Sequence, residues 1–238
     1  MRRSLMDGHA QKRLIRKLDL ERFIGSLAPQ PNPQAKLEQY TTSEQIAANM
    51  LYLAAYTNGD IVGKRVLDLG CGTGRLGLGA AFLGAKEVVG IDIDRVAIKT
   101  AHENAELAGL DVELVNGDVN AIIGEFDTVL QNPPFGVQTR EADRVFLVKA
   151  LEVGGSTYSL HNHPEVDERL IKMLKSSGGM VQVQPSPFLE RFISKYGGSV
   201  KAVYAMLMTI PKMFEFHRKL KHDFVIDLYI IQKAALDS

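Results

Sequence analysis

The sequence contains a single cysteine, Cys71, and no tryptophan among its 238 residues. One cysteine excludes an internal disulfide and a metal cage built from cysteine thiolates. Lys and Arg together number 28, as do Asp and Glu, so the formal net charge is zero. An excess of global charge therefore does not draw the chain to nucleic acid or to membranes, and any site for a polyanion must be a local patch.

Long apolar runs are also missing. No run reaches the length of a membrane span, and the first residues lack the apolar core of a secretory signal. Hydrophobic residues make up 45% and charged residues 24% of the chain, which is the usual balance of a globular protein. We therefore expect a chain that does not enter membranes, a reducing cytoplasmic location, and one large domain with a modest extension.

The sequence does contain alternating short apolar runs and helical patterns. Strands are expected at 65–70, 87–94, 111–118, 126–131 and 156–161, with helices at 43–57, 74–84, 95–109 and 141–152. This alternation predicts right-handed βαβ units and a parallel sheet. Further helices are expected at 164–179, with Pro164 at its start, and at 187–198. Strands at 200–208 and 224–232 would close the chain as an antiparallel pair at the sheet edge.

The predicted fold is therefore α/β and Rossmann-like, with a mostly parallel seven-stranded sheet, helices on both faces and an antiparallel C-terminal hairpin. Residues 1–25 show a helical pattern that is basic on one side, and a proline-rich connector follows it. We expect an N-terminal basic helix and connector over 1–35 and the main domain over 36–238.

The first strand-to-helix turn carries an acid followed by three alternating glycines: Asp68, Gly70, Gly72 and Gly74. Glycines there let a ligand approach the backbone. Asp92 ends the next strand, where a carboxylate can hold ribose hydroxyls, and Asp118 ends the third, where it can take an adenine amino group.

The spacing of this turn decides between cofactors. A dinucleotide turn is G-x-G-x-x-G, whereas this one is G-x-G-x-G after an acid, which repels phosphate but can pair with an ammonium group. S-adenosylmethionine has an ammonium group, a ribose and an adenine but no phosphate, so the set predicts that cofactor. The alternative is a tight turn that serves only packing.

The fourth strand ends in an unusual corner, "QNPPFG" (131–136). The strand lies next to the first in such a sheet, so Asn132 should face the transferred methyl group. The Asn132 side-chain oxygen and the Pro133 carbonyl can accept both hydrogens of an exocyclic amine and aim its lone pair. Pro133 and Pro134 stiffen the turn, and Phe135 offers a face on which a planar base can stack. This motif is typical of methyltransferases that act on adenine N6, cytosine N4 or glutamine amides.

With these residues placed, the chain resembles the methyltransferase-like-five family, the archaeal and eukaryotic ribosomal RNA adenine-N6 methyltransferases, within the class I S-adenosylmethionine-dependent methyltransferases. The resemblance covers roughly residues 36–161 and 211–230. It rests on "KLEQYTT" (36–42), "DLGCGTGRLG" (68–77), "GIDID" (90–94), "NGDV" (116–119), "QNPPFG", "YSLH" (158–161), "FEFHRK" (214–219) and "IDLY" (226–229).

The resemblance implies a catalytic domain over 36–238 in which Gln39 and Tyr40 line the cofactor pocket. It also implies RNA, expected to be ribosomal, as the substrate and a small zinc-ribbon activator protein as a possible partner. The chain departs from the family in a longer link over 176–200 and in the basic N-terminal helix. Elements outside the core choose the RNA, so these departures bear on the target.

Other residues near the expected substrate mouth have weaker signals. Arg140 and Arg144 follow the corner and are candidates for phosphate contacts, and His161 and His217 for hydrogen bonds to substrate. The spacing of the histidines matches no zinc pattern, so no metal is expected. Two alternatives stay open: a protein glutamine-amide methyltransferase, and a non-catalytic cofactor-binding partner subunit.

Overall fold

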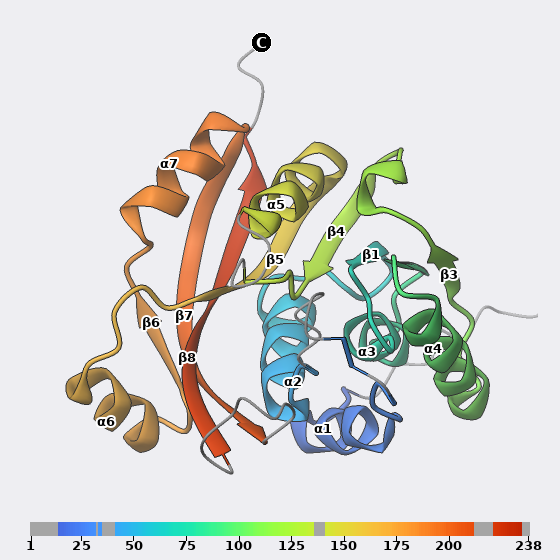
Figure 1. The fold of residues 1–238 in the computed structure, drawn as a ribbon, viewed down its shortest axis with the longest axis horizontal. Helices are drawn as coiled ribbons and strands as arrows, with labels where there is room; N and C mark the ends of the chain where they lie inside the picture. The colour runs from blue at the N-terminus through green and yellow to red at the C-terminus, as the bar shows by residue number, and fades with distance from the viewer. Residues whose placement is uncertain (1–13, 32, 35–40, 136–140, 212–220, 235–238) are drawn as a thin grey trace, which may run out of the picture.

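The structure is a computed structural model that describes residues 14–31, 33–34, 41–135, 141–211 and 221–234, with only the backbone described at 209–211 and 221–224. An eight-stranded sheet in the order β3-β2-β1-β4-β5-β8-β7-β6 forms its centre (Figure 1). The strands are β1 (Arg65–Leu69), β2 (Glu87–Asp92), β3 (Glu113–Asn116), β4 (Phe126–Gln131), β5 (Gly154–Asn162), β6 (Met180–Val183), β7 (Gly198–Pro211) and β8 (Lys221–Lys233).

Strands β1 to β5 run parallel, as predicted, and β8 is antiparallel to both β5 and β7. Because β4 pairs with β1, the corner after β4 lies beside the glycine turn after β1. The helices are α1 (Lys17–Ser26), α2 (Glu44–Tyr52), α3 (Arg75–Leu83), α4 (Arg95–Ala108), α5 (Ala142–Val153), α6 (Glu168–Ser176) and α7 (Pro187–Lys195), with a π-helical turn η2 (Leu53–Thr57) and a 3-10 turn η3 (Val119–Ala121).

The two faces of the sheet are covered by different helices. Leu228 and Ile230 of β8 belong to a core cluster that also contains side chains of α1, α2 and α3. Their neighbours Tyr229 and Ile231 belong to a cluster with α5 and α7. Successive side chains of a strand point to opposite faces, so the helices lie on both faces of the sheet, as predicted.

Helix boundaries follow local capping. The Ser43 hydroxyl accepts a hydrogen bond from the Ile46 N–H, and the Asp94 carboxylate accepts one from the Val96 N–H, which starts α2 and α4. Gly109 ends α4 with a φ of 63°, as expected of a left-handed C-terminal glycine.

Two features of the C-terminal half differ from the prediction. The sheet has eight strands rather than seven, because Met180–Val183 forms β6 against β7, and the pair β7–β8 therefore lies inside the sheet and not at its edge. The helix expected from Pro164 starts later, at Glu168. Asp167 is the cap there, since its side chain accepts a hydrogen bond from the Leu170 N–H at 2.7 Å.

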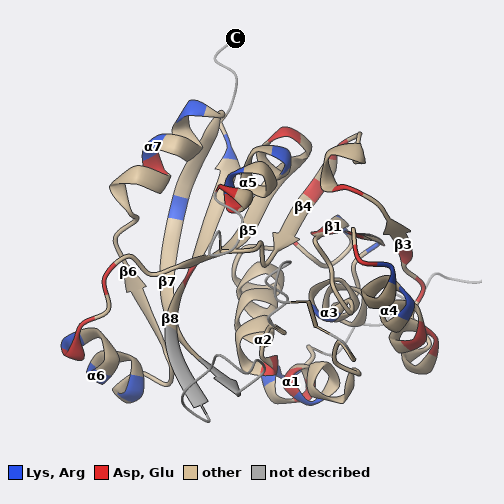
Figure 2. Ribbon diagram, in the orientation of Figure 1, with Lys and Arg blue, Asp and Glu red and all other residues tan. Residues whose placement is uncertain are grey.

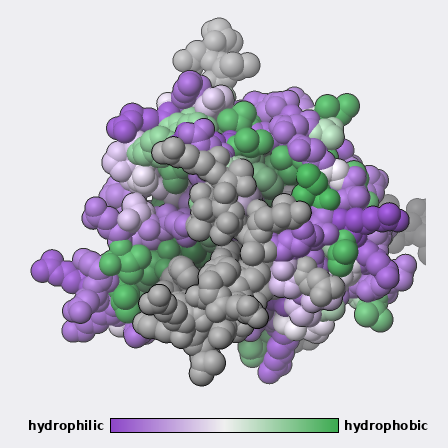
Figure 3. All heavy atoms as spheres, in the orientation of Figure 1, coloured by the Kyte–Doolittle hydropathy of each residue, from purple (hydrophilic) through white to green (hydrophobic). Residues whose placement is uncertain are grey.

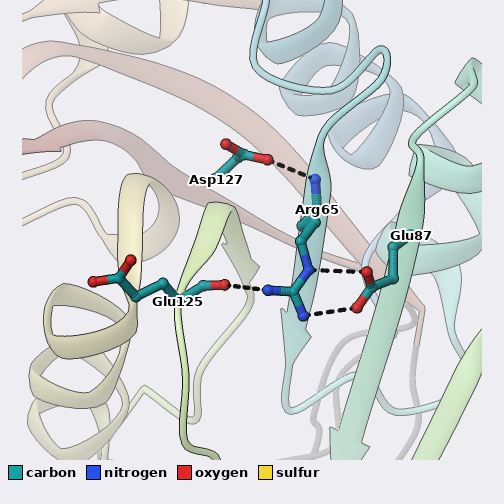
Figure 4. Close-up of polar contacts among 4 residues, drawn as sticks. All are labelled: Arg65, Glu87, Glu125 and Asp127. Atoms are coloured by element: carbon teal, nitrogen blue, oxygen red, sulfur yellow. Dashed lines mark hydrogen bonds and ion pairs between the residues drawn. The ribbon is translucent and has the colours of Figure 1, made fainter.

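The amino-terminal end of the central strands is held by Arg65 (Figure 4). Its guanidinium makes two hydrogen bonds to Glu87 of β2, at 2.9 and 2.8 Å, and one to the Glu125 carbonyl at 2.8 Å, while its backbone N–H donates to Asp127 at 2.8 Å. The pairing raises the pKa of Arg65 and lowers that of Glu87. These contacts join β1, β2 and the start of β4 at the end of the sheet opposite the glycine turn.

None of the helices in the described part of the chain is long and apolar enough to cross a membrane. In α1, Leu20 and Ile24 are fully buried and belong to the same core cluster as α2 and α3. The division between 1–35 and 36–238 is retained as a proposal.

Candidate active site

A cavity of about 270 Å³ opens where the parallel strands β1, β2 and β4 end. Polar and small residues that were predicted from the sequence line it: Asp68, Gly70, Gly72, Asp92, Asp118, Asn132 and Pro134. They come from four separate stretches of the chain. The parallel strands β1 to β5 bring them together, because these strands end on the same side of the sheet. Gly74 is not among the lining residues; it lies behind the cavity, at the start of α3.

The glycine turn needs glycine for two reasons. Gly70 has a φ of 73°, in the region that favours glycine, and a Cβ placed on it would lie 2.6 Å from the Phe146 ring. Phe146 itself lines the cavity. The Gly72 N–H donates to the Asp92 carboxylate at 2.8 Å, so the turn is held against the end of β2. The backbone of Gly70 and Gly72 therefore lines the cavity with no side chain of its own.

Asp68 is almost completely buried below this turn, with 1% of its surface exposed. One carboxylate oxygen accepts a hydrogen bond from the Gly77 N–H in α3 at 2.7 Å. Burial, followed by the like charge of Asp92, raises the pKa of Asp68 to about 7, in spite of that hydrogen bond. A cation at the cavity floor would offset the burial of this charge. The predicted pairing with a cofactor ammonium group is therefore electrostatically favourable.

Asp92 lies at the end of β2 and accepts two backbone hydrogen bonds, from Gly72 and from Asp94, each at 2.8 Å. Burial raises its pKa, and these two bonds oppose the shift. The carboxylate is thus held in one orientation at the cavity wall. Asp118 caps η3 by accepting from the Asn120 N–H at 2.8 Å, which fixes it at the neighbouring strand end.

The side chain of Asn132 is oriented by a residue far away in the sequence. Its Nδ2 donates to the Thr42 hydroxyl at 2.9 Å. Its Oδ1 is buried, and no group in the described part of the chain donates to it. A buried acceptor without a donor costs free energy, so a ligand with an N–H group would find a preformed partner here. Pro133 is buried, and Phe135 is partly buried and packs against the main core cluster.

Three residues of this site have no clear sequence signal. Thr42 and Arg75 line the cavity, and an Arg75 guanidinium N–H donates to the Thr42 carbonyl at 3.1 Å. Burial lowers the pKa of Arg75. Gln30 also lines the cavity and donates to Asp94 at 2.7 Å. The contact between Thr42 and Asn132 spans 90 positions of sequence, so no local pattern predicts it. In the sequence, only the motif "KLEQYTT" indicated that the segment containing Thr42 belongs to the site.

The structure does not bring the predicted substrate residues Arg144 and His161 to the cavity wall. Arg144 pairs with Glu141 at 2.7 Å and lies over the Phe188 ring. His161 is 3% exposed, and burial lowers its pKa to about 4. The roles of both residues stay predictions, as do those of the lining residues. Gln39, Tyr40, Arg140 and His217 lie outside the described residues.

Comparisons with known proteins agree with this geometry. The family model described as "Methyltransferase small domain" matches residues 46–175. The uncharacterized protein MJ0284 of Methanocaldococcus jannaschii is 37% identical over 94% of this chain and 98% of its own length. The rRNA N(6)-adenosine-methyltransferase METTL5 of Danio rerio is 32% identical over 88% of this chain and 95% of its own length.

A solved structure is also similar over nearly the whole chain. It is the crystal structure of PH1948 from Pyrococcus horikoshii, a protein proposed to be an RNA methyltransferase. The identity is 35% and the TM-score 0.77, with 93% of this chain and 99% of that chain covered. The match covers a larger part of the chain than the family model does.

Proposed function

Because this chain belongs to the methyltransferase small domain family and to the METTL5 family of methyltransferases, we propose that it methylates the N6 amine of an adenine in ribosomal RNA. S-adenosylmethionine is its cofactor, and this cofactor supplies an electrophilic methyl group on a sulfonium. We assign the ammonium group to Asp68, the ribose hydroxyls to Asp92 and the adenine to Asp118. The positions of all three at the cavity support this assignment.

The Asn132 side-chain oxygen, to which no described residue donates, carries the proposal for the reaction. An adenine amine is a weak nucleophile, because its lone pair is delocalised into the ring. A hydrogen bond from the amine to Asn132 Oδ1, and a second to the Pro133 carbonyl, would favour a pyramidal nitrogen with its lone pair aimed at the methyl carbon. When bound, the cofactor would supply the methyl group and its sulfur would keep the electron pair of the broken bond, while Asn132 and Pro133 would hold the amine until its extra proton leaves to water. Positioning and electrostatics therefore provide the catalysis, without a strongly basic side chain.

Phe135 and the partner belong to the same proposal. We assign Phe135 to stacking on the target base, and we include a small zinc-ribbon activator protein and a cytoplasmic location. The resemblance to the methyltransferase-like-five family supports the activator, and the single cysteine is consistent with a reducing compartment.

Ribosomal RNA from cells that lack the gene provides the test. We expect the purified protein, alone or with its activator, to transfer labelled methyl groups to this RNA, and mass spectrometry of the digested RNA to show N6-methyladenosine. The Asn132→Ala variant should bind S-adenosylhomocysteine like the parent and transfer almost no label. Label in a protein glutamine instead would favour a glutamine-amide methyltransferase. Unchanged cellular function of Asn132→Ala would favour a non-catalytic subunit.

A further inference from the structure

Three aromatic side chains, four residues apart, lie along one side of α7 and its C-cap, and we call them the aromatic stripe: Phe188, Phe192 and Tyr196. The ring centroids of Phe188 and Phe192 are 6.3 Å apart, and those of Phe192 and Tyr196 are 4.8 Å apart. Leu189 and Ile193 already hold the helix on the sheet, and both are buried. Phe188 remains 48% and Tyr196 41% exposed. Figure 3 shows hydrophobic surface over this helix.

The stripe begins beside α5, a helix that contributes residues to the cavity wall. The guanidinium of Arg144 lies 5.0 Å from the centroid of Phe188. Arg144 and Phe146 both belong to the N-terminal part of α5, and Phe146 lines the cavity. Two residues apart on a helix, the two side chains point to different sides, so Arg144 holds Phe188 on the side of α5 that faces away from the cavity. The Ser186 N–H, just before α7, donates to the Tyr229 hydroxyl of β8 at 2.8 Å and fixes the start of the helix. The stripe therefore starts next to the N-terminal end of α5 and runs along a helix that is anchored to the sheet.

Cations lie along one side of the stripe. A helix turns by about 100° per residue, so Arg191 and Lys195 lie between the stripe and solvent, whereas Glu190 lies on the opposite side of α7. The Lys195 ammonium is 5.4 Å from the centroid of the Tyr196 ring. Figure 2 shows basic residues on α7 and on the adjoining part of the sheet. Exposed rings next to cations are the combination that binds unpaired nucleic acid.

We propose that the aromatic stripe stacks unpaired RNA bases that flank the target adenine, while Arg144, Arg191 and Lys195 contact their phosphates. This proposal rests on the proposed function and adds to it a binding surface outside the cavity. Arg144 now pairs with Glu141 at 2.7 Å, but both side chains are more than one third exposed. Such a pair contributes little, so a phosphate can compete for the guanidinium.

Binding of a labelled single-stranded RNA tests the stripe. The probe is an oligonucleotide of roughly 16 nucleotides, uridine except for one central adenine, measured by fluorescence anisotropy with protein saturated with S-adenosylhomocysteine. Tyr196→Leu keeps the apolar bulk but removes the ring, and we expect at least about fivefold weaker binding. Tyr196→Phe keeps the ring and should bind like the parent. Lys195→Ala should reduce the slope of log affinity against log salt by about 1.

A matched control is Leu107→Ala on α4, where the side chain is 88% exposed. It should leave RNA binding unchanged. Equal affinity of the parent, Tyr196→Leu and Phe188→Leu would overturn the stripe, and so would a parent that does not bind this RNA. If Tyr196→Leu instead changed the molecular mass in light scattering and left RNA affinity intact, the stripe would be a protein contact.

The RNA-binding role of the stripe and the proposed methyltransferase function can be refuted independently, because RNA binding is measured without methyl transfer. If the parent protein bound the oligonucleotide through Tyr196 but transferred no methyl group to ribosomal RNA, the proposed function would be overturned and the RNA-binding role of the stripe would stand. If the parent and Tyr196→Leu methylated ribosomal RNA with the same KM, the RNA-binding role of the stripe would be overturned and the proposed function would stand.

Discussion

Replacing Thr42 by valine should abolish most of the activity without disturbing the fold. The change removes the hydroxyl that accepts from Asn132 Nδ2 at 2.9 Å and keeps nearly the same shape. In the structure this hydroxyl holds the amide nitrogen, and no described residue donates to the oxygen, which the proposed mechanism assigns to the substrate amine. Without the hydroxyl, the nitrogen would be buried beside a methyl group.

The magnitude follows from the cost of that buried nitrogen. A donor left unsatisfied costs about 1–3 kcal/mol, and a flip of the amide relieves this cost by turning the nitrogen toward the cavity. The productive orientation would then be populated about 5- to 150-fold less. After such a flip the Asn132 NH2 group, a donor, would stand where the side-chain oxygen accepted, and it would repel the N–H groups of the proposed substrate amine. We therefore expect kcat to fall by this factor, whereas S-adenosylhomocysteine affinity stays close to that of the parent.

Methyl transfer to ribosomal RNA from cells lacking the gene measures this effect. Thr42→Ser keeps the hydroxyl and serves as the control, with activity near that of the parent. In an Asn132→Ala background, Thr42→Val should cause little further loss, because the two residues act through one contact. Full kcat in Thr42→Val, or losses that simply add in the double variant, would refute the role of Thr42 in orienting Asn132.

Four other changes test the remaining parts of the site. The affinity for S-adenosylhomocysteine, measured by calorimetry, should fall as the pH decreases below the Asp68 pKa of about 7, by up to about tenfold per pH unit. The reason is that the protonated acid no longer attracts the ammonium group of the ligand. Asp68→Asn should remove this pH dependence. Asp92→Ala should raise the Kd for S-adenosylhomocysteine roughly 10- to 150-fold, through loss of hydrogen bonds to a charged group worth about 1.5–3 kcal/mol. Gly70→Ala should lower Tm, because a positive φ costs about 1–2 kcal/mol and the new Cβ meets Phe146. Burial lowers the pKa of His161 to about 4, so the unfolded chain binds a proton at a higher pH than the folded chain does. The free energy of unfolding should therefore decrease by about 1.4 kcal/mol per pH unit as the pH falls from 6.5 to 4. Urea unfolding should show a smaller decrease in His161→Gln.

The parallel half of the sheet was predictable because its signals are local. Residues 126–131 form β4 as expected, since an apolar run ends at two prolines that cannot continue it. The glycine turn and the acids at the ends of β1 and β2 were also identified, because chain order alone places them at one edge of a parallel sheet.

The eighth strand was not predictable in the same way. β6 has four residues, of which three are only half-buried, and it follows Gly178 and Gly179. So short a run has no clear alternation. It forms because it pairs with β7 along an edge that would otherwise leave backbone N–H and C=O groups unpaired. Partners of this kind, like the Thr42–Asn132 contact, depend on tertiary structure and leave no pattern in a single sequence.

The polar residues at the end of β4 contact two different parts of the structure. Neighbouring residues of a strand point to opposite faces, so Gln131 and Asn132 turn away from each other. Gln131 donates to the Ser159 hydroxyl at 2.8 Å, and that hydroxyl lies 2.8 Å from the His161 ring, which joins β4 to β5. Asn132 instead turns to Thr42, and within the described residues its oxygen receives no hydrogen bond. That oxygen carries a cost of about 1–3 kcal/mol. In the proposed mechanism a bound amine would relieve this cost, so part of the free energy of binding would come from the hydrogen bond that orients the nitrogen that receives the methyl group.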